Sequence, residues 1–520
     1  MRTSILAPAL LLLGLIPPSA NAEFKLARLF SDHAVLQSGV DVPVWGWAEA
    51  GEQVTVTLGG HTSSATAGKD GRWVLKLPPL KPGGPHVLQA KAGTASLTVS
   101  DVLVGEVWLG SGQSNMAMTV GNSKDFEKEQ KAAHLPNIRM FTVGGSATKE
   151  PQQDCVGSWV VCSPETVGRF SATAYFFGRD IHTALKVPVG LINSSVGGTP
   201  IDSWLDADVQ RASKELAPMF GNTEPPPDLE ALRAKYEKDL AEWKEKAKLA
   251  KKNGQTAPRM PRDPVATAQR KGDIGGLFNG KIAPLVPYAL KGFLWYQGEA
   301  NTVFTKAPYY QFQLPLLVQD WRKRWNMPNA PFAWVQLPNF VGRGNGWCIV
   351  REAMLKTLTL PNTGMAVTID VGDPKDIHPK NKQAVGDRLA RWALGSAYGQ
   401  KVATCGPLMK SHEIIGPHVV IKMNHADGGL IGKDGLQGFV ICGEDQVWKT
   451  ATVKIDDSKL FVSSPEVPKP VAVRYAWHET PPVTLWNAAG LPASPFRTDN
   501  FPVEPDLEVR KAVAARPKRS

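Results

Sequence analysis

The sequence has 520 residues, of which 42% are hydrophobic and 21% charged, and its formal net charge is +11. This composition is typical of a globular protein and excludes a largely disordered chain or one built of membrane spans, while the length predicts two or three domains. The basic residues are spread along the chain and concentrate only at its C-terminal end, so the charge does not predict a nucleic-acid partner.

The first residues predict an export signal. Met1-Arg2-Thr3 is a basic start, an apolar run covers 5–16, and Ala20-Asn21-Ala22 is typical of a signal-peptide cleavage site. The apolar run is too short to span a bilayer, and no later stretch is long enough. We therefore expect cleavage near Ala22 and export of the mature protein to the periplasm or the extracellular medium.

Five cysteines are an odd number for an exported protein. Cys155 and Cys162 are close in sequence and could close a small disulfide. Cys405 and Cys442 could pair in the C-terminal region, which leaves Cys348 over. The sequence does not fix this connectivity. No C-x-x-C spacing occurs, so no zinc site is predicted.

Residues 23–104 predict an N-terminal β-sandwich. Short segments with strand character alternate with Gly- and Pro-containing turns. The clearest of these segments are 42–47, 53–58 and 73–77. Trp45 and Trp47 could form a surface that stacks on sugars, but packing in the core is the commoner role of such residues.

Residues 105–400 predict an α/β domain with a parallel sheet, because strands alternate with helices. After the strand that contains Val107, strands are expected at 187–196, 290–296, 331–337 and 364–369. Helices are expected at 170–185, 309–325, 351–359 and 381–398. In open α/β sheets the ligand lies beyond the carboxyl ends of the strands, so the loops that follow these strands are candidates for a site.

Three other segments fall outside this alternation. Residues 206–275 predict a helical insertion, since apolar residues recur every three or four positions between 228 and 253. The insertion either packs over or near the site or, as we favour, is a helical decoration without a catalytic role. Residues 401–505 predict a C-terminal β-rich domain, and 506–520 a disordered basic tail.

Ser114 is the candidate nucleophile. It follows an apolar strand in the turn Gly112-Gln113-Ser114-Asn115-Met116. A nucleophilic Ser must be exposed, fixed and within reach of a base. The turn lacks the G-x-S-x-G pattern of the α/β-hydrolases. Because a Ser in such a place is more often structural or a helix cap, the interpretation depends on a base and oxyanion donors elsewhere.

His378 is the candidate base. It lies on the loop between the strand at 364–369 and the helix at 381–398, and three acids precede it closely: Asp370, Asp373 and Asp376. The other nine histidines lie in the two β-rich regions or have no nearby acid cluster. Only His378 therefore combines a strand-end loop with a group that could orient an imidazole.

The oxyanion of an acyl transfer needs hydrogen-bond donors. The backbone N–H groups of Ser114 and Gly198 are candidates, because Gly lets the backbone approach a substrate closely. The side-chain amide of Gln297, which also follows a strand, is a third. The alternative for the segment around Gln297 is a polar turn that only caps a helix.

Four segments together resemble one family. G-Q-S-N-M, S-V-G-G-T-P-I-D-S-W, W-Y-Q-G-E-A-N and G-D-P-K-D-I-H-P-K-N-K occur in the order found in sialate O-acetylesterases, which are SGNH (GDSL-like) carbohydrate acetylesterases. The resemblance covers about 105–395, and the N-terminal β region is also similar. It implies an SGNH-hydrolase-like (flavodoxin-like) sheet with flanking helices. It also implies Ser114 as nucleophile, His378 as general base, and Ser114, Gly198 and Gln297 as oxyanion donors.

The acid that orients His378 is left open. Many SGNH enzymes have an Asp three residues before the His, where this sequence has Lys375. Asp376, two residues before, is our first choice. Glu299 is the rival, because the Glu of Q-G-E has been proposed for this role in related acetylesterases. Arg351 resembles part of a recurrent family segment and is expected either to line the site or to form an ion pair within its helix.

The resemblance implies a serine esterase, without cofactor or metal, that removes O-acetyl groups from sugars. The first expectation for its substrate is 9-O-acetyl sialic acid, and an acetylated plant or algal polysaccharide such as xylan or xyloglucan fits the same chemistry. The alternative from another class is a carbohydrate-binding protein without turnover. No nucleic acid or membrane span is expected, and the sequence does not indicate an oligomeric state.

Overall fold

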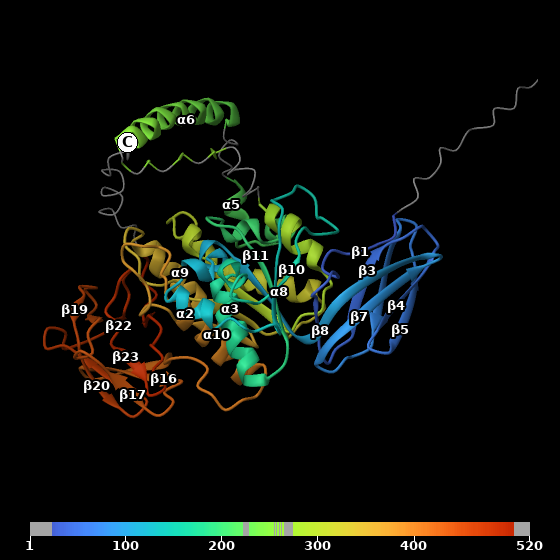
Figure 1. The fold of residues 1–520 in the computed structure, drawn as a ribbon. Coiled ribbons are helices and arrows are strands. Elements are labelled where there is room, and N and C mark those ends of the chain that lie inside the picture. The colour runs from blue at the N-terminus through green and yellow to red at the C-terminus, as the bar shows by residue number, and fades with distance from the viewer. Residues whose placement is uncertain are drawn as a thin grey trace, which may run out of the picture.

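The structure is a computed structural model in which an α/β body lies between two β-rich regions (Figure 1). The residues that it describes are 23–221, 228–253, 255, 257–258, 260–261, 263–264 and 274–503. The predicted export signal and basic tail, and parts of the predicted insertion, lie outside the described residues.

The central sheet of the body is mainly parallel. Its strand order is β10-β9-β11-β8-β12-β13-β14, and only β10 runs antiparallel to its neighbour. These strands are β8 Ala95–Gly112, β9 Ile138–Thr142, β10 Trp159–Val161, β11 Val189–Ser195, β12 Gly292–Tyr296, β13 Phe332–Val335 and β14 Thr363–Ala366. After β8 the chain builds the sheet first on one side and then on the other. The strand order therefore reverses at β8, and such a switch point is where open α/β sheets bind ligands.

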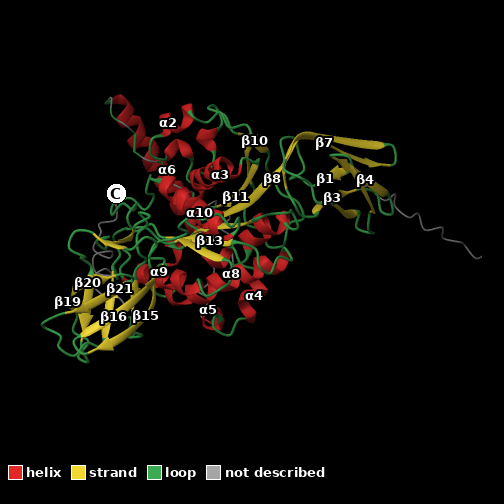
Figure 2. Cartoon of the chain, turned by 90° about the horizontal axis from the view of Figure 1, so that it is seen from below, coloured by secondary structure: helices red, strands yellow, loops and turns green. Residues whose placement is uncertain are grey.

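Helices cover both faces of this sheet (Figure 2). The longer ones are α3 Ala172–Leu185 and α10 Lys382–Ser396 on one face, and α8 Tyr310–Arg324 and α9 Asn345–Thr357 on the other. Along β12, Phe293 and Trp295 pack with α8 and α9, whereas Leu294 and Tyr296 pack with α3 and α10. This alternation follows from the two-residue period of a strand, and it buries both faces. The predicted α/β class is confirmed.

The short helices lie in the loops of the body. They are α1 Ser114–Ala117, α2 Phe126–Lys131, α4 Ala207–Ala212 and α5 Ala217–Gly221. Among them, α1 begins at the candidate nucleophile and lies directly beyond the end of β8.

The N-terminal region and the body share one strand. The first part of β8 pairs antiparallel with β7, and its last residues pair parallel with β11 and β12. The boundary predicted after residue 104 thus falls inside a continuous strand. The other strands of this region are β1 Lys25–Leu26, β2 Val35–Gln37, β3 Val42–Trp47, β4 Gln53–Leu58, β5 His61–Thr66, β6 Arg72–Leu77 and β7 Gly83–Ala92. Trp45 is fully buried, with its ring against those of Phe30 and Tyr288 at centroid distances of 4.9 and 6.3 Å, which confirms its role in the core.

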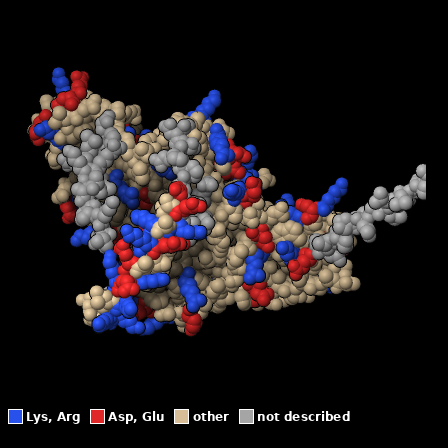
Figure 3. Space-filling view, turned by 90° about the horizontal axis from the view of Figure 1, so that it is seen from above, with Lys and Arg blue, Asp and Glu red and all other residues tan. Residues whose placement is uncertain are grey.

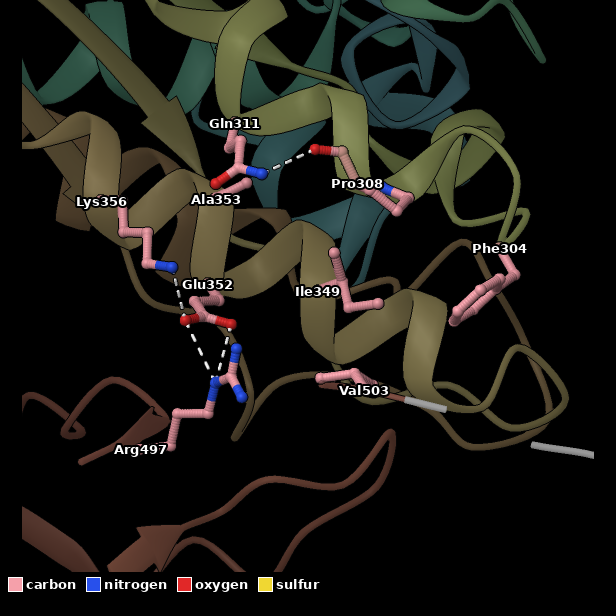
Figure 4. Close-up of a pocket in the computed structure, with 9 residues that line it drawn as sticks. All are labelled: Phe304, Pro308, Gln311, Ile349, Glu352, Ala353, Lys356, Arg497 and Val503. Carbon is pink, nitrogen blue, oxygen red and sulfur yellow. Dashed lines mark hydrogen bonds and ion pairs between the residues drawn. The ribbon is translucent and has the colours of Figure 1, made fainter. Parts of the chain in front are cut away.

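The C-terminal region has its own apolar core and three small sheets. Its strands are β15 Leu408–Ile415, β16 His418–Asn424, β17 Leu430–Gly432, β18 Phe439–Cys442, β19 Lys449–Thr450, β20 Thr452–Asp456, β21 Lys459–Ser463, β22 Ala472–Tyr475, β23 Leu485–Asn487 and β24 Phe496–Arg497. The region is tied to α9, because Glu352 of this helix accepts from Arg497 at 3.1 Å. Lys356, one turn further along α9, pairs with the same carboxylate at 2.8 Å (Figure 4).

The helix predicted in the insertion is α6, Leu229–Lys252. The Asp228 carboxylate caps its start, accepting from the N–H groups of Glu230 and Ala231, and Trp243 donates to the Pro258 carbonyl at 2.7 Å. In Figure 1 this helix lies at the top of the molecule. Both roles expected for the insertion, packing near the site and helical decoration, stay predictions.

None of the helices among the described residues is both long and apolar enough to cross a bilayer.

Neither of the two disulfides that the sequence allows is formed, since all five cysteines are free. Cys155 packs in the apolar cluster on the α8 side of the sheet and Cys162 in the cluster on the α3 side, so the sheet separates two residues that are close in sequence. Burial raises the pKa of both thiols to about 12. Cys405 and Cys442, the other two cysteines that could pair, are likewise not bonded.

The surface charges are mixed. On the face drawn in Figure 3, Lys and Arg are interspersed with Asp and Glu. No patch of one sign dominates that face, which agrees with the distribution of charge along the sequence.

Candidate active site

Loops that follow four parallel strands carry the predicted site residues. Ser114 follows β8, Gly198 follows β11, Gln297 and Glu299 follow β12, and His378 lies beyond β14. The strands β11, β8 and β12 are neighbours, so three of these loops begin side by side. The arrangement has the geometry expected of a site at the carboxyl edge of a parallel sheet.

Ser114 and His378 are in direct contact. The Nε2 atom of His378 lies 2.8 Å from Oγ of Ser114, and both side chains are half-buried. At this distance an imidazole can take the hydroxyl proton as general base. Gly112 brings the strand end close to β12: its φ is +135°, and a Cβ on it would overlap the Tyr296 carbonyl oxygen. The turn that presents Ser114 therefore requires Gly at position 112.

The Gly-Gly turn after β11 lies against Ser114. A Cβ built on Gly197 would be 3.4 Å from Cβ of Ser114. Gly198 is exposed and has a φ of +70°, in the left-handed region that favours Gly. Within the described residues, no backbone hydrogen bond uses the N–H of Ser114 or of Gly198. Both groups are therefore available to an oxyanion.

Gln297 differs from expectation. Its amide nitrogen donates to the Thr199 carbonyl at 3.1 Å and to Oδ1 of Asn301 at 2.7 Å, and its Oε1 accepts from the Tyr310 hydroxyl. Because both hydrogens of the amide are used inside the protein, Gln297 does not supply the third oxyanion donor in this conformation. It instead fastens the turn after Gly198 to the end of β12.

The two candidate acids occupy different places. Oδ1 of Asp376 accepts the backbone N–H of His378 at 2.9 Å and lies 3.7 Å from its Nδ1. Glu299 is buried, and its two oxygens accept from the side chains of Gln113 and Asn115, the latter at 2.6 Å. Asp376 thus adjoins the imidazole, although 3.7 Å exceeds hydrogen-bond distance, whereas Glu299 lies beneath the nucleophile turn. Burial raises the pKa of Glu299.

A buried Lys completes the surroundings of Glu299. Nζ of Lys382 donates to Oδ1 of Asn115 at 2.6 Å and lies 5.1 Å from the ring centroid of Tyr296. Burial lowers the pKa of this ammonium to about 7. In the sequence, Lys382 is visible only as the last residue of the segment around His378. Its role depends on contacts with α1 and β12 that the sequence does not reveal.

Arg351 also differs from expectation. It neither lines the site nor pairs within its helix, because its guanidinium is almost fully buried. All its hydrogen bonds go to oxygens outside α9, on the segments 337–339 and 478–479. Arg351 therefore fastens the loop after β13 to the C-terminal region.

Glu479 acts on the same loop from the C-terminal region. Its carboxylate accepts the backbone N–H groups of Gly342, Arg343 and Gly344, at 2.6 to 3.0 Å. Val341 in turn donates its N–H to the carbonyl of Pro374, on the loop that carries His378. The C-terminal region therefore shapes a loop next to the candidate base, a connection that the sequence does not reveal.

Among the described residues, no cluster of three or more His, Cys, Asp or Glu could hold a metal ion.

Comparisons with known proteins identify the family of the chain. The family model "Carbohydrate esterase, sialic acid-specific acetylesterase" matches residues 104–218 and 280–395. The unmatched stretch between them overlaps the predicted insertion. The sialate O-acetylesterase of Rattus norvegicus is 31% identical over 94% of this chain and 96% of its own, and that of Homo sapiens is 30% identical over 95% and 97%. The structure of a carbohydrate acetylesterase from Xanthomonas citri superposes with a TM-score of 0.78, at 34% identity, over 92% of this chain and 100% of that one.

Proposed function

The chain belongs to the sialic acid-specific acetylesterase family of carbohydrate esterases and is a carboxylic ester hydrolase, and from this premise we propose that it removes O-acetyl groups from sialic acids through an acetyl-enzyme on Ser114. The observation that carries the proposal is the 2.8 Å contact between Oγ of Ser114 and Nε2 of His378, with the turn at Gly197 against the same Ser.

In the acylation step, Oγ of Ser114 attacks the acetyl carbonyl while Nε2 of His378 takes its proton. The tetrahedral intermediate carries its negative charge on the former carbonyl oxygen. The N–H groups of Ser114 and Gly198 stabilise that oxygen, and the loss of one such donor costs about 3–4 kcal/mol of transition-state stabilisation in serine hydrolases. The imidazolium then protonates the sugar oxygen, which leaves as a hydroxyl.

In the deacylation step, His378 removes a proton from water. The resulting hydroxide attacks the acetyl group on Ser114, and the same two N–H groups stabilise the second oxyanion. Collapse of this intermediate releases acetate, and the proton on His378 returns to Oγ. We propose Asp376 as the acid that favours the imidazolium, because its carboxylate adjoins Nδ1.

For the substrate, we propose an acetylated sialic acid over a neutral polysaccharide. A sialic acid carries a carboxylate that a neutral sugar lacks, and Arg is the side chain best suited to bind a carboxylate. Arg343 is exposed on the loop that Val341 connects to Pro374. Its backbone N–H is held by Glu479 at 2.7 Å, which fixes the loop. We propose Arg343 as the group that binds this carboxylate.

We propose that the sheet is of the SGNH-hydrolase type, which the order β11-β8-β12-β13-β14 supports. We propose the domains 23–104, 105–400 and 401–505, and strand β8 is shared by the first two.

We also propose export of the protein after cleavage near Ala22. N-terminal sequencing of protein recovered from the periplasm or medium tests the export, which an intact Met1 there would contradict.

The function is tested by acetate release from a panel of substrates. The panel contains 9-O-acetyl sialic acid, acetylated xylan and acetylated xyloglucan, with p-nitrophenyl acetate as a reporter of esterase activity that does not depend on a sugar. We expect the highest kcat/KM on the sialic acid. A preference for xylan or xyloglucan would move the assignment to a polysaccharide esterase. Activity on none of the four would favour a carbohydrate-binding protein without turnover.

A further inference from the structure

We propose that Lys382 is a positioning residue that, through the side chain of Asn115, holds the nucleophile and the base at their working separation. The inference rests on the proposed function of Ser114 and His378, and it assigns a role to a buried cation that the mechanism above does not use.

Asn115 connects the two loops that must act together. It follows Ser114 directly, and its Nδ2 donates both to Oε1 of Glu299 and, at 3.0 Å, to the carbonyl of Ile377, the residue before His378. Its Oδ1 accepts from Lys382 at 2.6 Å. One amide therefore bonds the turn of the nucleophile to the loop of the base, and Lys382 and Glu299 fix that amide from opposite ends.

The position of Lys382 is costly, so the buried ammonium needs specific partners that compensate it. It is fully buried, and it is the first residue of α10, where the helix dipole disfavours a cation. The groups that compensate it are the carboxylates of Glu299 and Asp376 and the ring face of Tyr296. An apolar side chain of similar length, such as Met, would avoid this cost, but it could not donate to Asn115.

The consequence is a dependence on pH. Burial lowers the pKa of Lys382 to about 7, while the charges of Glu299 and Asp376 act in the opposite direction. As pH rises through this range the cation is lost, and Glu299 is left as a buried anion without its counter-charge. We therefore expect kcat to fall as the pH rises and Lys382 loses its proton.

The test compares Glu299→Gln, Lys382→Met, Lys382→Arg and the double variant Glu299→Gln/Lys382→Met with the wild type. Lys380→Met is the control, because Lys380 is exposed and only two residues away. The measurements are kcat and KM for p-nitrophenyl acetate from pH 5 to 10, with circular dichroism as a check of folding. The double variant removes both buried charges. The amide that it introduces at position 299 can be accommodated if the Gln113 amide turns over, since Oε1 of Gln113 is buried without a partner among the described residues.

We expect Lys382→Met to lower kcat by about 10- to 100-fold with a much smaller change in KM, because a small misplacement of catalytic groups has effects of this size. Lys382→Arg should retain more activity and move the alkaline fall to higher pH, since a guanidinium keeps its charge. The double variant should recover part of the loss, and Lys380→Met should behave as the wild type.

The proposal is overturned if Lys382→Met folds and keeps the kcat and pH profile of the wild type, or if the losses in the double variant simply multiply. If Lys382→Met does not fold, the pH profile of Lys382→Arg and the kcat of the double variant decide instead. An alkaline fall in Lys382→Arg at the same pH as in the wild type would then overturn the proposal. A wild type without any esterase activity would instead contradict the proposed function, so the two failures are distinguishable.

Discussion

The imidazole Nε2 of His378 lies 2.8 Å from Oγ of Ser114, although 264 positions separate the two residues in the chain. Ser114 follows the strand at which the order of the sheet reverses, and His378 lies beyond the last strand of that sheet, at the same edge. A parallel sheet gathers the ends of distant segments in this way, and here it brings together the residues that we propose as nucleophile and base.

The first prediction concerns the acid. Asp376→Asn should lower kcat by about 10- to 100-fold, less than the loss of a fully buried triad acid, because this carboxylate is half exposed and screened by water. Glu299→Gln should lower kcat much less, because Glu299 bonds to Asn115 and does not adjoin the imidazole. A larger loss of kcat in Glu299→Gln than in Asp376→Asn would exchange the two roles.

The second prediction concerns the oxyanion donors. Gly198→Ala should lower kcat by about 10- to 100-fold, because a side chain at a φ of +70° strains the turn that presents the N–H. Gly39→Ala is the matched control, with a φ of +72° and open space around its Cβ position in the N-terminal region. Equal kcat values for the two variants would contradict a role for the Gly198 N–H in catalysis.

The third prediction concerns stability. Arg351→Met should reduce the free energy of unfolding by about 2–4 kcal/mol, because buried carbonyl oxygens of the segments 337–339 and 478–479 lose their donor. Denaturant unfolding measures the change. Arg391→Met, which removes a surface pair with Asp387, should cost less than about 1 kcal/mol. A raised KM without loss of stability in Arg351→Met would mean that Arg351 lines the site after all.

The fourth prediction concerns specificity. Arg343→Ala should reduce the preference for 9-O-acetyl sialic acid over an acetylated neutral sugar by about 10-fold or more, since a hydrogen bond to a charged group is lost. The measurement is the ratio of the two kcat/KM values. Lys76→Ala, which removes an exposed cation from β6, is the charge-matched control. An unchanged ratio in Arg343→Ala would remove Arg343 from substrate recognition.

Local patterns in the sequence predict most of the fold. The strands expected at 42–47 and 53–58 coincide with β3 and β4, and the amphipathic pattern between 228 and 253 is α6. The start of α9 does not follow from the pattern, because Gly342, Gly344 and Gly346 are typical of a loop. In the structure Glu479, 135 residues away from Gly344, accepts the N–H groups that precede this helix. A cap supplied by a distant segment leaves no local pattern.

The candidate site, like the fold, follows only in part from local patterns in the sequence. The sequence identifies the loops that carry Ser114, Gly198 and His378, since each follows a strand. It does not reveal that the Gln297 amide is occupied by Thr199 and Asn301, or that Lys382 reaches Asn115. Which hydrogen bonds a side chain makes depends on neighbours that only the folded chain brings together.

The rate of acetate release from 9-O-acetyl sialic acid by the purified wild type and by Ser114→Ala tests the central claim most directly. Ser114→Ala removes the nucleophile, and in serine hydrolases such a change lowers the rate by about 10³-fold or more. The account predicts that the wild type releases acetate and that the rate of the folded Ser114→Ala variant falls to about that extent. Equal rates for the two proteins would contradict an acetyl-enzyme on Ser114.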